Sequence, residues 1–155
     1  MYRLKSPDLP ESTLQASSRA TESIFQASDR SFLNKSEELM TYEVEYTDEF
    51  EQWYLTLDAQ TQDSVDSAVE LLEARGPNLP FPKSSGVNGS RHQHLRELRI
   101  QHKGEPYRIL YAFDPRRTAI LLLGGNKKGN DRWYEENVPL ADGSLSSRVI
   151  RRNYN

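Results

Sequence analysis

Basic side chains gather in the second half of this 155-residue chain, where they could act together on a phosphodiester. Several fixed positive charges can hold a phosphate and stabilise the additional negative charge of a pentavalent transition state. A phenol close to them could orient the attacking hydroxyl. The candidates for these catalytic roles are Arg99, Arg108, Lys127, Lys128 and Tyr134.

A second set of side chains could contact a nucleic acid around these residues. Arg96, His102, Lys103 and Arg132 carry, or can carry, positive charge. The indole of Trp133 offers a ring for base stacking, although an aromatic residue on a short helix more often anchors that helix to a sheet. We therefore expect these five residues to bind RNA.

Three histidines are candidates for proton transfer near neutral pH. His92 and His94 precede an expected strand, and His102 lies at an expected turn. No carboxylate or further histidine completes a recognisable metal spacing around them. We expect neither a metal nor a cofactor.

Charge is divided unequally along the chain. Residues 41–80 contain ten acidic residues and one basic residue, for a net charge of −9, whereas residues 81–134 contain eleven basic and four acidic residues, for a net charge of +7. The overall charge of −3 conceals both fields. Because concentrated positive charge attracts polyanions by counterion release, the basic part favours a nucleic-acid partner.

Composition excludes several classes of protein. The chain contains no cysteine, so it has neither disulfides nor thiolate metal sites, which fits a reducing compartment. The N-terminus lacks the apolar segment of a signal peptide, and no run approaches the roughly 20 apolar residues of a membrane span. We expect a cytoplasmic protein with no membrane partner.

The composition and periodicity of the sequence change at residue 40. Residues 1–39 are rich in Ser, Glu, Gln and Thr without helical or strand periodicity, and we expect disorder or a marginal helix there. A single domain is expected over residues 40–142, and a C-terminal tail over residues 143–155.

Hydrophobic periodicity within the domain predicts strand, helix, helix, strand, strand, strand, helix. The strands are expected at residues 42–46, 95–100, 107–113 and 118–124. The helices are expected at residues 48–57, 58–75 and 131–137, and residues 77–90 are expected to form a loop. The fold class is α+β, with an antiparallel-rich sheet and a helical hairpin packed on one face.

Strand alternation groups some of the candidate residues. In the strand from Leu95, the side chains of Leu95, Glu97 and Arg99 share one face, whereas Arg96 lies mainly on the other. If the next strand pairs through a short hairpin, Arg108 comes close to Arg99. Each arginine could instead merely solvate a face of the sheet.

Several segments in order resemble the RelE/ParE superfamily of toxins from toxin–antitoxin systems, and within it the HigB-like, phage-derived branch. The resemblance covers roughly residues 40–142. It is carried by residues 43–50 with Trp53, by residues 94–100, 107–115 and 121–128, and by the ending at residues 133–142.

The resemblance implies an mRNA interferase, a metal-independent endoribonuclease that is commonly associated with the ribosome. In this family the 2′-hydroxyl attacks the adjacent phosphate and leaves a cyclic phosphate. By motif, Arg99 and Arg108 match basic residues of the second and third strands, Lys127 or Lys128 matches the basic residue after the fourth, and Tyr134 lies near the late aromatic. The partners implied are mRNA, the ribosome and a cognate antitoxin, usually with a helix-turn-helix.

One position departs from the family pattern. Glu97 stands where RelE is basic, so the general base is open between Glu97, a histidine and a side chain with a depressed pKa. Two other functions also stay open: a ParE-like toxin that inhibits DNA gyrase by binding alone, and an inactive RNA-binding module.

Overall fold

The computed structural model describes residues 41–153, with side-chain surroundings described up to residue 148. Its elements in chain order are β1 (Val44–Tyr46), α3 (Asp48–Leu55), α4 (Ala59–Arg75), a 3-10 turn η1 (Gly76–Asn78), β2 (Ser84–Gly86), β3 (Arg96–His102), β4 (Glu105–Phe113), β5 (Ala119–Asn126) and α5 (Trp133–Asn153). The expected N-terminal segment at residues 1–39 lies outside the described residues.

The five strands form one sheet in the order β1-β5-β4-β3-β2. Strand β1 runs parallel to β5, and the other neighbours are antiparallel. The predicted α+β class with an antiparallel-rich sheet is confirmed. The short strand β2 lies within the segment that we expected to be a loop, where it pairs with the start of β3.

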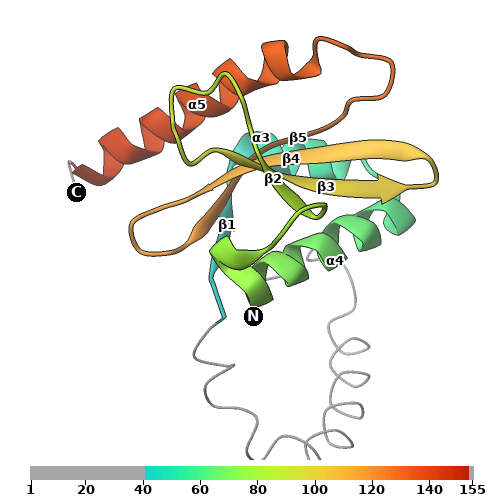
Figure 1. Ribbon diagram of the computed structural model, residues 1–155, viewed down its shortest axis with the longest axis horizontal. Helices are drawn as coiled ribbons and strands as arrows, with labels where there is room; N and C mark the ends of the chain where they lie inside the picture. Colours follow the sequence, from blue (N-terminus) through green and yellow to red (C-terminus); the bar gives the residue numbers. More distant parts are fainter. Residues whose placement is uncertain (1–40, 154–155) are drawn as a thin grey trace, which may run out of the picture.

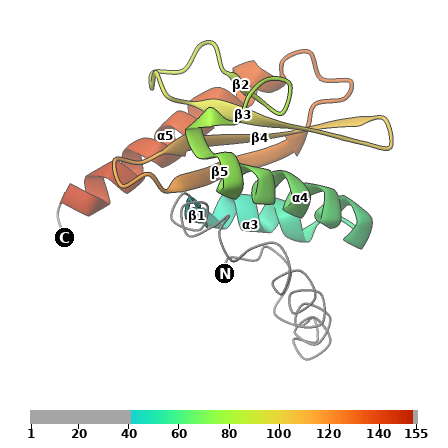
Figure 2. The same cartoon turned by 60° about the horizontal axis from the view of Figure 1, so that its bottom comes forward.

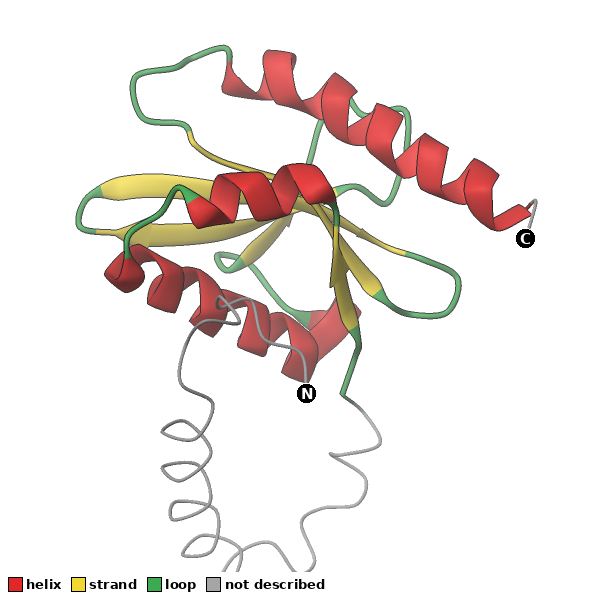
Figure 3. Ribbon diagram, turned by 180° about the vertical axis from the view of Figure 1, so that it is seen from behind, coloured by secondary structure: helices red, strands yellow, loops and turns green. Residues whose placement is uncertain are grey.

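Helices cover both faces of the sheet (Figure 1). The hairpin of α3 and α4 packs on one face, as predicted, and α5 crosses the other face (Figure 2). Two separate apolar cores result: α3 and α4 bury residues such as Phe50 and Val65, and α5 buries Val138 and Leu145. The view from behind shows the sheet between these two helical layers (Figure 3).

Side-chain caps mark the start of both helices of the hairpin. The Thr47 hydroxyl accepts a hydrogen bond from the Phe50 amide at 3.1 Å, and Asp58 accepts one from the Thr61 amide at 2.8 Å. Thr47 also donates to the Leu122 carbonyl at 2.8 Å, which joins the start of α3 to β5. The caps therefore set where each helix begins.

Helix α5 is longer than the sequence suggested. We expected a helix over residues 131–137 followed by a tail from residue 143, but α5 continues through Pro139 and Gly143 to Asn153. Its apolar residues Val138, Ala141 and Leu145 all contact the sheet, so packing overrides the two helix breakers.

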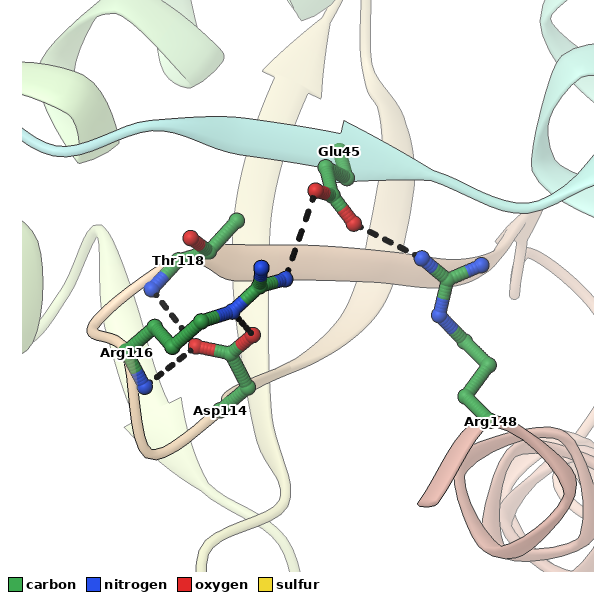
Figure 4. A network of polar contacts seen from close by, with 5 residues as sticks. All are labelled: Glu45, Asp114, Arg116, Thr118 and Arg148. Carbon is green, nitrogen blue, oxygen red and sulfur yellow. Dashed lines mark hydrogen bonds and ion pairs between the residues drawn. The ribbon is translucent and has the colours of Figure 1, made fainter. Parts of the chain in front are cut away.

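A polar network joins the C-terminal half of α5 to β1, an edge strand of the sheet (Figure 4). Arg148 of α5 contacts Glu45 of β1 at 2.8 Å, and Glu45 also faces Arg116 of the β4–β5 turn at 3.8 Å. Asp114 shapes that turn because it accepts hydrogen bonds from the amides of Arg116 and Thr118, both at 2.9 Å. The network fixes the direction in which α5 crosses the sheet.

Two adjacent glycines on β5 leave space for the indole rings of Trp53 and Trp133. A Cβ atom at Gly124 would lie 2.2 Å from the Trp53 ring of α3, and one at Gly125 would lie 2.7 Å from the Trp133 indole nitrogen of α5. The side chains of consecutive strand residues point to opposite faces, so one indole packs closely against each face. Gly124 is therefore needed for the close approach of α3 to β5, and Gly125 for the close approach of α5 to β5.

Candidate functional site

A cluster of charged and polar side chains lies on the α5 face of the sheet and centres on Glu97 of β3. One carboxylate oxygen, Oε1, faces Arg108 Nε at 3.3 Å and Arg99 Nη1 at 3.9 Å. The same oxygen accepts a hydrogen bond from the Tyr134 hydroxyl at 3.1 Å. Two strands and the first turn of α5 thus meet at one carboxylate, and we name Glu97, Arg99, Arg108, Lys127 and Tyr134 the Glu97 cluster.

Sheet register brings these residues together. Arg99 and Arg108 are direct partners across the β3–β4 ladder, and Glu97 is paired with Leu110, two residues further along β4. Glu97 is therefore the diagonal neighbour of Arg108 on the same face, within reach of a long side chain. The predicted approach of Arg99 and Arg108 is confirmed by this register.

Arg99 and Arg108 differ in burial, and this difference indicates different roles for them. The side chains of Glu97 and Arg108 retain only 4% and 6% of their accessible surface, whereas Arg99 retains 35%. Arg108 also donates from Nη1 to the Tyr107 carbonyl at 2.9 Å. Arg108 is therefore committed to neutralising Glu97 inside the protein, and Arg99 is the arginine that a bound phosphate could contact directly.

Lys127 supplies a second available positive charge. Its ammonium lies over the Tyr134 ring, 5.8 Å from the ring centre, which is a cation–π contact. Among the described residues it forms no ion pair with a carboxylate. Lys128, in contrast, is exposed and pairs with Glu105 at 3.2 Å, so it points away from the Glu97 cluster.

Tyr134 is held as a neutral phenol. Burial raises its pKa above the ordinary value of 10.0, and the hydrogen bond to the Glu97 carboxylate raises the pKa further. Near neutral pH the hydroxyl is therefore protonated and donates a hydrogen bond to Glu97. Such a phenol positions neighbouring groups rather than accepting a proton.

Most of the expected RNA-contacting residues lie outside this cluster. Arg96 points to the other face of the sheet, where its Nε donates to the Ser84 hydroxyl at 3.0 Å. His102 and Lys103 contact α4, through Ser64 and Gln60. We predicted all three residues as RNA contacts, but strand alternation and the β3–β4 turn place their side chains away from the Glu97 cluster.

The start of α5 also differs from the prediction. Trp133 is buried in the apolar core beneath α5, in contact with Gly125, so its indole is not available for stacking on a base. Arg132, directly before α5, is exposed and pairs with Glu135 of that helix at 3.0 Å. The structural interpretation of Trp133 as an anchor is the correct one.

The histidines do not join the Glu97 cluster either. His92 lies within hydrogen-bond distance of the Ser146 hydroxyl, 3.1 Å from its Nε2. With His94 it lines a groove of about 860 Å³ beside the far half of α5, whose floor includes Leu95, Ala112 and Leu145. Neither residue is placed to serve the proton transfer that we considered for it.

One residue beside the cluster was not predicted. Phe81, between two prolines in the segment before β2, places its ring under the Arg99 guanidinium, 5.1 Å from the ring centre. The sequence signal was an isolated aromatic in an otherwise polar, proline-rich loop. Phe81 lies beside Arg99 because the following strand, β2, pairs with β3, and the sequence did not predict this pairing.

No group of three His, Asp or Glu side chains within the described residues is arranged to hold a metal ion. In the same residues, every helix is too short or too polar to cross a bilayer.

Comparison with known proteins identifies relatives of this chain. The family model described as "Phage derived protein Gp49-like (DUF891)" matches residues 52–146. Two proteins of Mycobacterium tuberculosis (strain ATCC 25618 / H37Rv) are similar in sequence. "Putative toxin HigB3" is 48% identical over 93 residues, which cover 59% of this chain and 80% of that protein. "Putative toxin HigB2" is 42% identical over 101 residues, which cover 64% of this chain and 50% of that protein.

The solved structures that match this chain share little sequence with it. The archaeal RelE–RelB complex from Pyrococcus horikoshii OT3 matches with a TM-score of 0.44 and 16% identity, over 58% of this chain and 99% of that one. A mutant of the E. coli toxin RelE in the free state matches with a TM-score of 0.45 and 12% identity, over 62% of this chain and 94% of that one.

Proposed function

The chain belongs to the phage-derived Gp49-like family, and we propose on that premise that it is the toxin of a type II toxin–antitoxin pair that acts as an mRNA interferase. The similarity to HigB3, which extends over 80% of that protein, supports the toxin assignment. The observation that carries the nuclease assignment is the Glu97 cluster, in which two accessible cations lie beside a buried, neutralised carboxylate.

The charge of the Glu97 cluster suits a phosphodiester. Three cations and one carboxylate leave a net charge of about +2 once Glu97 is neutralised. Because Arg108 neutralises Glu97 in the interior, the charges of Arg99 and Lys127 are left to act on a bound anion. Arg99 would hold the non-bridging oxygens, and Lys127 would stabilise the charge that develops on the leaving oxygen.

The proposed reaction needs no redox change. The 2′-hydroxyl oxygen forms a bond to the adjacent phosphorus and gives up its proton, while the bond between phosphorus and the 5′ oxygen breaks and that oxygen gains a proton. The products are a 2′,3′-cyclic phosphate and a 5′-hydroxyl. Glu97 and Tyr134 act as positioning residues, because the buried Glu97 contacts Arg99 and the partly buried Tyr134 contacts both Glu97 and Lys127.

The proposed partners follow from this function. mRNA is the substrate, and the ribosome is the place where cleavage occurs in the cytoplasm. A cognate antitoxin with a helix-turn-helix would keep the toxin inactive. Acidic or apolar antitoxin side chains covering Arg99 and Lys127 would block RNA and complement the charge of the Glu97 cluster.

Primer extension on mRNA in a translation extract tests the proposal. Wild-type protein is expected to produce discrete cuts, and Arg99→Gln and Lys127→Gln are each expected to slow cutting by about 10²-fold, as for other donors that stabilise transition-state charge. Arg75→Gln is the matched control, because Arg75 is an exposed cation in the last turn of α4, which packs on the opposite face of the sheet from the cluster. Its cutting rate should equal that of the wild type.

The same extract, together with a DNA supercoiling assay with gyrase, separates the alternatives. Arrest of translation with intact mRNA would support an inactive RNA-binding module. Inhibition of DNA supercoiling by gyrase, with no effect on mRNA, would support a ParE-like toxin. Cutting that persists at the wild-type rate in both cluster variants would contradict the assigned site.

A further inference from the structure

Phe81 is an aromatic ring that the fold leaves in solvent beside the Glu97 cluster. It retains 68% of its accessible surface. The other exposed large hydrophobic residues in the described part of the chain, Leu55, Leu71 and Leu140, all retain less. It belongs to neither of the two apolar cores. The ring therefore contributes little to packing, and its placement calls for another explanation.

The position of the ring is defined by its neighbours. The Arg99 guanidinium lies over one face, 5.1 Å from the ring centre. Because so much of the residue is still exposed, the opposite face of the ring is open. A flat ligand could therefore stack on Phe81 from the solvent side while its attached phosphate reaches Arg99.

The segment that carries Phe81 is held firmly to the sheet. The amides of Lys83 and Ser84 both donate to the Pro80 carbonyl at 3.1 Å, and the Arg99 amide donates to the Lys83 carbonyl at 2.9 Å. Prolines on both sides of Phe81 restrict the backbone further. A ring presented on such a segment loses little conformational entropy when a ligand binds.

Charge around the ring matches a nucleic acid. Lys83 is exposed two residues after Phe81, and within the described residues its side chain has no hydrogen bond or ion pair. Arg99 and Lys83 thus place positive charge around an open aromatic face. Aromatic stacking combined with backbone-binding cations is the usual way in which proteins hold single-stranded bases.

We propose that Phe81, with Arg99 and Lys83, forms a stacking site for a base of single-stranded RNA next to the phosphate that Arg99 contacts. This inference rests on the proposed function, because it places the site on the same substrate. The base would stack on the open face of Phe81, and Lys83 would contact the backbone beyond it. The site would thereby hold the nucleotide that lies beside the cleaved bond.

Binding of a short single-stranded RNA of mixed sequence, with 2′-O-methyl riboses that block 2′-hydroxyl attack, tests the site by fluorescence anisotropy. Phe81→Ala and Phe81→Leu are each expected to weaken binding about tenfold, and Phe81→Tyr, which keeps the ring, should bind like the wild type. Leu140→Ala removes another highly exposed hydrophobic side chain, from α5, and should change nothing.

Two results would overturn the stacking site. Equal binding by wild type and Phe81→Ala would remove the role of the ring, and wild-type binding by Phe81→Leu would show that apolar volume rather than stacking is recognised. Failure of the wild type to bind the probe would also overturn it.

Cleavage of unmodified mRNA by the same variants separates this inference from the proposed function. If the wild type cuts mRNA and Phe81→Ala cuts it with an unchanged KM, the nuclease stands and the stacking site falls. If the wild type binds the probe through Phe81 but never cuts, the stacking site stands and the nuclease falls. A raised KM with an unchanged kcat in Phe81→Ala supports both.

Discussion

Replacing Arg108 by methionine is expected to destabilise the fold severely. The change leaves the Glu97 carboxylate buried, with 4% of its side-chain surface exposed, and removes the closest charge that compensates it, at 3.3 Å. Arg99 remains at 3.9 Å but is itself partly in solvent. Breaking one side of a buried ion pair costs roughly 3–5 kcal/mol, which is a large part of the stability of a domain of this size.

Urea denaturation followed by circular dichroism measures this cost, and a double-mutant cycle assigns it. Arg108→Met alone should lower the free energy of unfolding by about 3–5 kcal/mol, while Arg108→Met with Glu97→Leu should recover most of the loss, because no unpaired charge remains. Arg99→Met is the matched control, since a partly exposed arginine in a longer ion pair contributes about 0–1 kcal/mol.

The reasoning would be refuted by a small effect of the single change. A loss below about 1 kcal/mol in Arg108→Met would mean that the Glu97 carboxylate is solvated or paired elsewhere. A double variant as unstable as the single one would mean that packing of the arginine stem, rather than the unpaired carboxylate, causes the loss.

Three further predictions concern the scaffold. Gly124→Ala should lower the free energy of unfolding by about 1–3 kcal/mol in urea denaturation, because the new Cβ would meet the Trp53 ring at 2.2 Å; an unchanged midpoint would contradict that packing. Thr47→Ala should cost about 1–2 kcal/mol through loss of the α3 cap, and Thr47→Ser should retain most of it. Burial, reinforced by the hydrogen bond to Asp66, raises the pKa of Tyr54 above its ordinary value of 10.0, so the folded state holds this proton more tightly and stability should fall as pH rises beyond 10. Tyr54→Phe should flatten that decline in alkaline denaturation, and an identical alkaline slope would contradict the assignment.

Elements with strong apolar periodicity were predictable from the sequence. Residues 107–113 and 118–124 form β4 and β5 nearly at the expected bounds, since their side chains fill both cores. Strand β2 has the sequence Ser84-Ser85-Gly86, which carries no such signal, and it exists because β3 offers an edge with which it pairs. Helix α5 was underestimated because local propensity at Pro139 opposes a helix that tertiary packing stabilises.

The candidate site was predictable only in part. Alternation and a short hairpin predict that Glu97, Arg99 and Arg108 share a face, which the register confirms. The depth at which Arg108 is buried depends on how α5 and β4 pack together, and no local pattern encodes it. The same holds for Phe81, whose contact with Arg99 joins segments that only the sheet brings together.

The central claim is that Arg99 and Lys127 act on an RNA phosphate beside the Glu97–Arg108 pair. The most direct measurement is the rate at which cut ends appear, together with their chemical identity. Ribosome-bound mRNA is treated with wild type, with the double variant Arg99→Gln/Lys127→Gln, or with Arg75→Gln. We predict 2′,3′-cyclic phosphate ends from the wild type and from Arg75→Gln at equal rates, and a loss of more than about 10²-fold in the double variant, which should remain folded. Equal rates from all three proteins, or intact mRNA with the wild type, would contradict the claim.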